Sequence, residues 1–314
     1  MRRSSIPISS FAGRNTRTPN RRIRTTACAV LIVAAAACDK LGMRDASPTA
    51  PSGPLTPGST VNYTAVGASD ATGHGASVEC VPLTDCPQGT GYVPVTAREL
   101  RARGFTVTLL NLGIPTAVIG RDFQSLGRQY NHTIVGNFID DEMPFVRNST
   151  LVTVFAGGNE VNVITSALGN GAGGSDPAGY IDSQVRAFGS DYATLISGIR
   201  DRAAAGVHII VLNVPNFGAL PYLARASTSQ RQAAQRAAVG MTTTAVNPLA
   251  GAQNVSVVDI MCDARTYQSS NYSSDGFHPN DSGYAFIAAE IVNAATASSY
   301  PAPRSTCPQM TAIP

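Results

Sequence analysis

The sequence predicts an α/β fold: a three-layer sandwich in which a parallel sheet of about five strands carries helices on both faces. The first observation is that short apolar, β-branched runs alternate with segments of helical periodicity over residues 61–296, as in a series of βαβ units. The second is that Val207–Val214 is almost entirely apolar, as a strand buried on both faces should be. We find no internal repeat and no second domain, so a single sheet should organise the folded part.

The individual elements follow from local patterns. Short β-branched and apolar runs predict strands at residues 61–66, 105–110, 149–155, 207–214 and 255–260. Helical spacing predicts helices at residues 92–103, 121–130 and 183–205, within 228–248, and at 281–296. The segment 166–179 is rich in Gly, Ser and Asn and is expected to be a loop.

A candidate functional residue follows each of the first three predicted strands. Ser69 lies on a glycine-flanked turn two residues after Gly67, Gly113 follows the second strand, and Asn159 follows the third. The carboxyl ends of parallel strands meet at one edge of the sheet, which is where such folds place their functional groups. Taken alone, the first turn fits a nucleophilic serine and a plain Gly/Ser turn equally well.

The charge distribution separates an N-terminal segment from the rest of the chain. The net charge of the 314 residues is +3, but seven arginines and no acidic residue precede Cys38. Without those arginines the remaining chain has a net charge of −4, so its body is mildly acidic. We find no basic patch with interleaved aromatic residues, and we therefore expect no nucleic-acid partner.

The first 38 residues have the organisation of an export signal. A basic stretch, Met1–Arg24, is followed by the apolar run Thr25–Ala37 and by Cys38. Ala35–Cys38 resembles a bacterial lipoprotein signal, which implies lipidation of Cys38; an uncleaved anchor and ordinary cleavage near Ala37 are the alternatives. Residues 39–60, with four prolines among Ser, Thr and Gly, are expected to be a linker to the domain at 61–314. The protein is thus expected in the bacterial cell envelope or outside the cell.

The remaining cysteines are consistent with export. Cys80, Cys86, Cys262 and Cys307 form an even set, which suggests two disulfides with three possible pairings. Proximity in the sequence favours Cys80–Cys86 and Cys262–Cys307. A zinc site is the weaker alternative, because no two cysteines have CxxC spacing and no pair of histidines lies nearby. No metal is expected.

A second polar motif lies just before the last predicted helix. Asp275 precedes His278 by three residues, with Gly276 between them and Pro279 after them. A tight turn would let the carboxylate reach Nδ1 of the imidazole, which leaves Nε2 free to take a proton from a serine. A solvated loop or a structural pair is the alternative; one carboxylate and one histidine are too few ligands to favour a metal.

Four separated motifs together are similar to the SGNH, or GDSL-like, hydrolase family. They are Gly-Ala-Ser-Asp at 67–70, Asn-Leu-Gly at 111–113, Gly-Gly-Asn-Glu at 157–160 and Asp-Gly-Phe-His-Pro at 275–279. The resemblance covers about residues 61–297 and implies a flavodoxin-like sheet. Two positions depart from the family pattern: Asp70 follows the serine instead of an aspartate preceding it, and Glu160 replaces the usual aspartate. These departures concern the subfamily and the substrate more than the mechanism.

The resemblance also implies a role for each residue. Ser69 would be the nucleophile, His278 the general base and then acid, and Asp275 its orienting partner. The backbone N–H groups of Ser69 and Gly113 and the side-chain amide of Asn159 would form the oxyanion hole. These residue types suit the chemistry, because a serine needs a base and a tetrahedral oxyanion needs fixed donors.

Several neighbouring residues are given secondary interpretations. His74 could line the entrance of the site, although a histidine on a surface turn is the simpler interpretation. Glu160 and Asp70 could anchor their turns. Phe217–Tyr222, after the fourth strand, could shape an acyl pocket, although hydrophobic packing on the core is the simpler alternative.

Together these observations predict a secreted or lipid-anchored serine esterase that needs no cofactor and acts through an acyl-enzyme. Its partners would be small-molecule, lipid or acylated-carbohydrate esters, with a membrane contact only through the lipid anchor. The sequence does not separate a simple esterase or lipase from a carbohydrate O-deacetylase, although the low aromatic content (6%, no Trp) favours simple esters. A non-catalytic surface binding protein on the same scaffold is the rival from another class.

Overall fold

The computed structural model describes residues 55–314. The predicted signal segment, the lipidation site Cys38 and most of the predicted linker therefore lie outside the described residues. The folded part begins slightly before the predicted end of that linker. Leu55 is buried and donates its N–H to the Ala295 carbonyl, and the first strand already begins at Thr60. Apolar burial of Leu55 explains why this end of the segment packs against the domain.

The sheet has the predicted composition. Its strands are β1 (Thr60–Gly67), β2 (Thr106–Asn111), β3 (Leu151–Phe155), β4 (His208–Leu212) and β5 (Val255–Val258). Their order is β2-β1-β3-β4-β5, and every neighbouring pair is parallel. The expected five-stranded parallel sheet is thereby confirmed.

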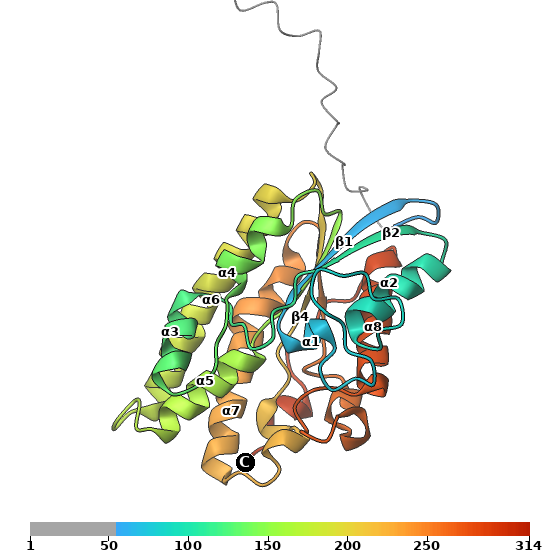
Figure 1. Cartoon of the computed structure of the whole chain (residues 1–314). Coiled ribbons are helices and arrows are strands. Elements are labelled where there is room, and N and C mark those ends of the chain that lie inside the picture. Colours follow the sequence, from blue (N-terminus) through green and yellow to red (C-terminus); the bar gives the residue numbers. More distant parts are fainter. Residues whose placement is uncertain (1–54) are drawn as a thin grey trace, which may run out of the picture. The chain divides into compact units, whose positions relative to one another are not determined.

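Helices cover both faces of this sheet (Figure 1). They are α1 (Ser69–Thr72), α2 (Tyr92–Ala102), α3 (Arg121–Gln129), α4 (Phe138–Asp141), α5 (Gly158–Gly169), α6 (Pro177–Arg202), α7 (Thr228–Met241) and α8 (Asp281–Thr296). Buried side chains of α2 and α8 form one apolar cluster with one face of the sheet, and those of α3, α5, α6 and α7 form a second cluster with the opposite face. The predicted three-layer sandwich is confirmed.

The segment predicted as a loop at 166–179 differs from the structure. Helix α5 occupies Gly158–Gly169, and only about seven residues separate it from α6, which begins at Pro177. The start of α6 has a helix N-cap signal that the Gly-, Ser- and Asn-rich composition concealed. The Asp176 side chain accepts a hydrogen bond from the Gly179 N–H, and Pro177 lies in the first turn, where its missing N–H costs nothing.

Both cysteine pairs expected from proximity occur in the structure. Cys80 is bonded to Cys86, and Cys262 to Cys307. Such bonds persist in oxidising compartments, so they are consistent with an extracytoplasmic location. Across residues 55–314, no helix is both long enough and apolar enough to cross a bilayer.

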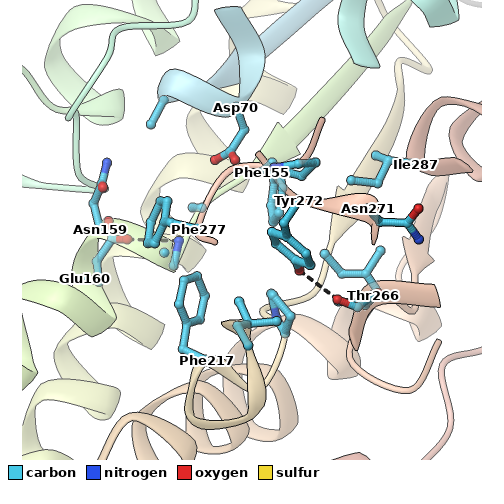
Figure 2. Close-up of a pocket in the computed structure, with 18 of the residues that line it drawn as sticks. Asp70, Phe155, Asn159, Glu160, Phe217, Thr266, Asn271, Tyr272, Phe277 and Ile287 are labelled. Carbon is cyan, nitrogen blue, oxygen red and sulfur yellow. Dashed lines mark hydrogen bonds between the residues drawn. The ribbon is translucent and has the colours of Figure 1, made fainter. Parts of the chain in front are cut away.

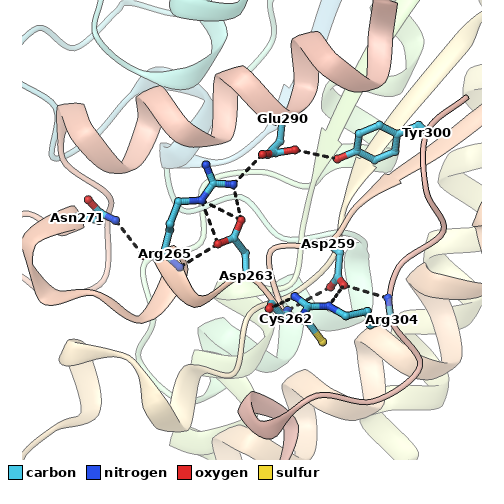
Figure 3. Close-up of polar contacts among 8 residues, drawn as sticks. All are labelled: Asp259, Cys262, Asp263, Arg265, Asn271, Glu290, Tyr300 and Arg304. Atoms are coloured by element: carbon cyan, nitrogen blue, oxygen red, sulfur yellow. Dashed lines mark hydrogen bonds and ion pairs between the residues drawn. The ribbon is translucent and has the colours of Figure 1, made fainter. Parts of the chain in front are cut away.

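Ion pairs hold the C-terminal third of the chain around β5 (Figure 3). The Arg265 guanidinium bridges Asp263 at 2.6 Å and Glu290 of α8 at 2.7 Å. In the C-terminal tail, the Arg304 backbone N–H donates to Asp259 at 3.0 Å. These contacts hold the first part of the long connection between β5 and α8, which carries the Asp275–His278 motif further along.

Candidate active site

The strand order creates a crevice at the carboxyl edge of the sheet. The chain leaves β1 toward β2 on one side and returns to β3 on the other side. At such a switch point the loops diverge and leave space for a ligand. Ser69 lies two residues after the end of β1, and Asn159 lies four residues after the end of β3, so both lie at this point.

The serine lies on a tightly packed turn. Its side chain is 8% exposed, and it begins the short helix α1. A Cβ on Gly67 would lie 3.1 Å from the Ala71 Cβ, a tight contact that glycine avoids where the strand turns into α1. Ser69 Oγ lies 2.8 Å from His278 Nε2, although 209 positions separate the two residues.

The Asp275 side chain organises the histidine turn. Its Oδ1 accepts the backbone N–H groups of Phe277 and His278 at 2.8 and 2.9 Å, together with the Ser273 hydroxyl. Its Oδ2 lies 2.6 Å from His278 Nδ1. Gly276 has a φ of +68°, which permits the turn, and a Cβ there would lie 2.7 Å from the Tyr222 backbone nitrogen.

Asp275 carries a negative charge at neutral pH. Burial raises the pKa of this carboxyl, but the hydrogen bonds from the His278 ring and backbone, Ser273 and Phe277 outweigh that effect and lower the pKa to about 2. Asp275 is thus an anion at neutral pH and faces Nδ1 of an imidazole whose Nε2 faces a hydroxyl. This arrangement can remove a proton from Ser69 and stabilise the resulting imidazolium.

Of the hydrogen-bond donors predicted for the oxyanion hole, the Asn159 amide has a free N–H, whereas the Gly113 N–H is already hydrogen-bonded. Asn159 donates one N–H of its side-chain amide to the Ala117 carbonyl at 2.7 Å, which fixes the amide plane and leaves its second N–H for another acceptor. Gly113 instead donates its backbone N–H to Asn111 Oδ1 at 3.0 Å. A Cβ on Gly113 would lie 2.7 Å from the Ala71 Cβ, so its place here is close packing behind the serine turn.

Thr116 lies in the same loop, three residues after Gly113, and was not among the residues predicted for the site. It lines the cavity that contains Ser69 and His278, and its φ is +67°, a strained conformation for a β-branched residue. Within residues 55–314 its backbone N–H has no acceptor. No sequence signal marks this position, because a positive φ at threonine is not visible in composition or periodicity.

Two buried glutamates hold the turns that carry Ser69 and Asn159. Glu160 accepts the Ile119 N–H at 2.5 Å with Oε1 and the Gly157 N–H at 2.9 Å with Oε2, as the predicted turn anchor would. Burial raises the pKa of Glu160 to about 7, against the opposing effect of these hydrogen bonds. Glu142 accepts only the Gly67 N–H, and its second oxygen has no partner; burial raises its pKa well above the ordinary value.

This difference predicts opposite results for two isosteric substitutions. At pH 8, Glu160→Gln should lower kcat about 10-fold or more, because the new amide NH₂ would face a backbone N–H and displace the turn that carries Asn159. Glu142→Gln should retain kcat, because the amide oxygen can still accept the Gly67 N–H and the amide nitrogen would replace an oxygen that has no partner. Steady-state kinetics on both variants, beside thermal unfolding, check the pair; equal losses would contradict this assignment.

The groove around Ser69 is open and of substrate size. Its volume is about 420 Å³, and its walls include His74, Thr116, His132 and Tyr222. The His74 ring packs edge-on against His278 with centroids 4.5 Å apart, and its Nδ1 lies 2.9 Å from the exposed Glu79. His74 is thus an exposed turn histidine that also lines the groove, so the structure agrees with both of its interpretations.

Three of these side chains have the chemistry of metal ligands. Within residues 55–314, only His74, Asp275 and His278 form a group of three such side chains, with one ligand atom from each lying within 4.8 Å of the others. Both ring nitrogens of His278 already have hydrogen-bond partners, Ser69 and Asp275. His278 therefore has no free ring nitrogen for a metal ion.

The sheet and the residues gathered at its switch point define the class of protein as an α/β acylhydrolase. More particularly, the chain belongs to the GDSL-like lipase/acylhydrolase family, whose family model matches residues 65–286. The SGNH/GDSL resemblance of the four motifs is thus confirmed. No curated protein sequence matches the chain.

Solved structures share the fold at low sequence identity. A lipase from a goat rumen metagenome is 15% identical with a TM-score of 0.54, over 76% of this chain and 100% of that chain. The acetyl xylan esterase AlAXEase is 16% identical with a TM-score of 0.43, over 74% and 99%. An acetylxylan esterase from Geobacillus stearothermophilus is 16% identical with a TM-score of 0.47, over 80% and 100%. At such identities the likeness concerns the fold alone.

Proposed function

We propose that this acylhydrolase is a serine esterase that cleaves carboxylic esters through an acyl-enzyme. The observation that carries the proposal is the continuous hydrogen-bonded series from Ser69 Oγ to His278 Nε2 at 2.8 Å and from His278 Nδ1 to Asp275 Oδ2 at 2.6 Å. A non-catalytic binding protein would have no need for this alignment of a hydroxyl, an imidazole and an anion.

In the first half-reaction, Ser69 Oγ attacks the ester carbonyl carbon while its proton passes to His278 Nε2. Asp275 stabilises the imidazolium that results. The tetrahedral intermediate collapses, the alcohol leaves with the proton from His278, and the acyl group remains on Ser69. In the second half-reaction, water donates a proton to His278 and attacks the acyl-enzyme, which releases the acid and restores the serine.

The negative oxygen of each tetrahedral intermediate needs fixed donors. We propose the Ser69 N–H, the free N–H of the Asn159 amide and the Thr116 N–H. Thr116 takes the place predicted for Gly113, because the Gly113 N–H is occupied by Asn111. Each donor of this kind typically lowers the barrier by about 3–4 kcal/mol.

The substrate class is a carboxylic ester whose alcohol part occupies the open groove of about 420 Å³. A volume of this order suits a small organic group. Simple esters and acetylated carbohydrates both remain within this class, and the wall residues His74, His132 and Tyr222 offer one ring each with no large stacking platform.

The proposed function is tested by covalent labelling. A fluorophosphonate should modify Ser69, and peptide mass spectrometry should locate the adduct there and at no other serine. A series of p-nitrophenyl esters from acetate to decanoate, beside acetylated xylan, then defines the acyl range. Modification absent from Ser69, together with no hydrolysis in the series, would contradict the proposal.

We also propose export with a lipid attached at Cys38. The basic and apolar N-terminal sequence supports this, as does the presence of two disulfides in the folded domain. Mass spectrometry of the mature N-terminus is the test. A diacylglyceryl-modified Cys38 at the first position supports the anchor, and an unmodified start elsewhere contradicts it.

A further inference from the structure

A second, smaller cavity lies behind the groove (Figure 2). Its volume is about 40 Å³, enough for about three water molecules. Aromatic side chains form much of its wall, among them Phe155, Phe217 and Tyr272. Phe277 and Asn159 line both this cavity and the groove around Ser69, so the two spaces adjoin at the proposed oxyanion site.

One carboxylate faces this apolar space. Asp70 directly follows Ser69, and Figure 2 shows its side chain turned toward the cavity between Phe155 and Phe277. No other residue within 55–314 donates a hydrogen bond to its carboxylate, and no Arg, Lys or His of that segment lines the cavity. Asp70 is partly exposed, and a carboxylate partly shielded from water without a partner is costly, so the free cavity lacks a complementary group.

Burial and neighbouring charges act on the pKa of Asp70. Burial raises it, the charges of His278 and His74 lower it, and the charge of Asp275 raises it. Glu160 also reaches the cavity, but both of its oxygens already accept backbone N–H groups. Asp70 is therefore the group to which an incoming cation would bind.

We propose that this cavity receives the acyl part of the substrate, and that the preferred acyl group carries an α-ammonium group that pairs with Asp70. This inference rests on the proposed esterase function. An ester carbonyl between Ser69 and Asn159 has two substituents: the open groove takes the alcohol and the small cavity takes the acyl side. In the acyl-enzyme, the acyl group is bonded to the residue that precedes Asp70.

Size and chemistry both fit a small aminoacyl group. Beyond the carbonyl carbon, an alanyl group adds three heavy atoms, which matches a space for about three waters. The ammonium would pair with the Asp70 carboxylate and lie near the faces of the surrounding rings, which attract cations. A long acyl chain would not fit without displacement of Phe217 or Phe277.

Three isosteric esters test this directly. Benzyl alaninate, benzyl lactate and benzyl isobutyrate share the alcohol and differ only in whether the α-substituent is an ammonium, a hydroxyl or a methyl group. At pH 6.5 the ammonium is mostly protonated. The wild type should show a kcat/KM for the alaninate at least about 10-fold above that for the isobutyrate, the scale of a charged hydrogen bond.

Asp70→Asn should bring that ratio close to one while the isobutyrate is still hydrolysed, which shows that the variant folds. The control Asp182→Asn also removes one negative charge, from an exposed ion pair with Arg236, and should leave the ratio unchanged. Equal rates for alaninate and isobutyrate in the wild type, an unchanged ratio in Asp70→Asn, or a preference for lactate alone would each overturn the inference. Hydrolysis of p-nitrophenyl acetate but of none of the three esters would overturn the inference alone, whereas hydrolysis of neither would also contradict the esterase function.

Discussion

Ser69→Ala is expected to lower kcat for p-nitrophenyl acetate by about 10⁴-fold or more, the loss seen when serine hydrolases lose their nucleophile. The reason is that no other hydroxyl in the groove is placed on an imidazole that is itself held by a carboxylate. Because a serine of 8% exposure is replaced by a smaller residue, the fold should be retained. Initial rates and thermal unfolding measured together separate lost chemistry from lost structure.

The chain offers a matched control. Ser256 Oγ lies 2.9 Å from His208 Nε2, but His208 begins β4 at the opposite edge of the sheet. Ser256→Ala removes a serine–histidine hydrogen bond of the same kind and should leave kcat unchanged. Equal activity in the wild type and Ser69→Ala would remove the acyl-enzyme mechanism.

Asp275→Asn is expected to lower kcat by about 10⁴-fold, with little change in KM. The asparagine oxygen can still accept the backbone N–H groups of Phe277 and His278, so the turn should persist. Its NH₂ group would face His278 Nδ1 and make that nitrogen an acceptor, which places the ring proton on Nε2. The imidazole could then no longer accept the proton of Ser69.

A double variant distinguishes this explanation from simple misfolding. If Ser69 and Asp275 act through one proton transfer, Ser69→Ala combined with Asp275→Asn should be no less active than Ser69→Ala alone. Because the pKa of Asp275 is about 2, its carboxylate is ionised in the wild type at every ordinary assay pH. An Asp275→Asn variant with wild-type kcat would contradict the assignment of Asp275 as the orienting group.

Much of the fold was predictable because its signals are local. An apolar run such as Val207–Val214 predicts a doubly buried strand without knowledge of its neighbours. Alternation of such runs with helices then implies a parallel sheet, and a parallel sheet brings the residues after β1 and β3 to the same edge. The close approach of Asp275 to His278 was also predictable, since only three positions separate them and Gly276 permits the turn.

Tertiary structure alone decided which backbone N–H groups near Ser69 are already hydrogen-bonded and which are free. Gly113 follows its strand as predicted, but Asn111 takes its N–H, whereas Thr116 reaches the groove with a backbone conformation that sequence does not show. Glu142 holds the serine turn from 75 positions away, and no pattern links the two.

The sequence by itself determined the succession of strands and helices along the chain and the residue types that follow the strands. These signals are local, because apolar periodicity and turn chemistry act over a few residues. Only the folded structure decided that Asp70 faces an apolar cavity without a partner while Glu160 is fully satisfied. Hydrogen-bond satisfaction and cavity shape arise from contacts between segments distant in the chain. The sequence alone therefore does not distinguish a satisfied acidic residue from an unpartnered one.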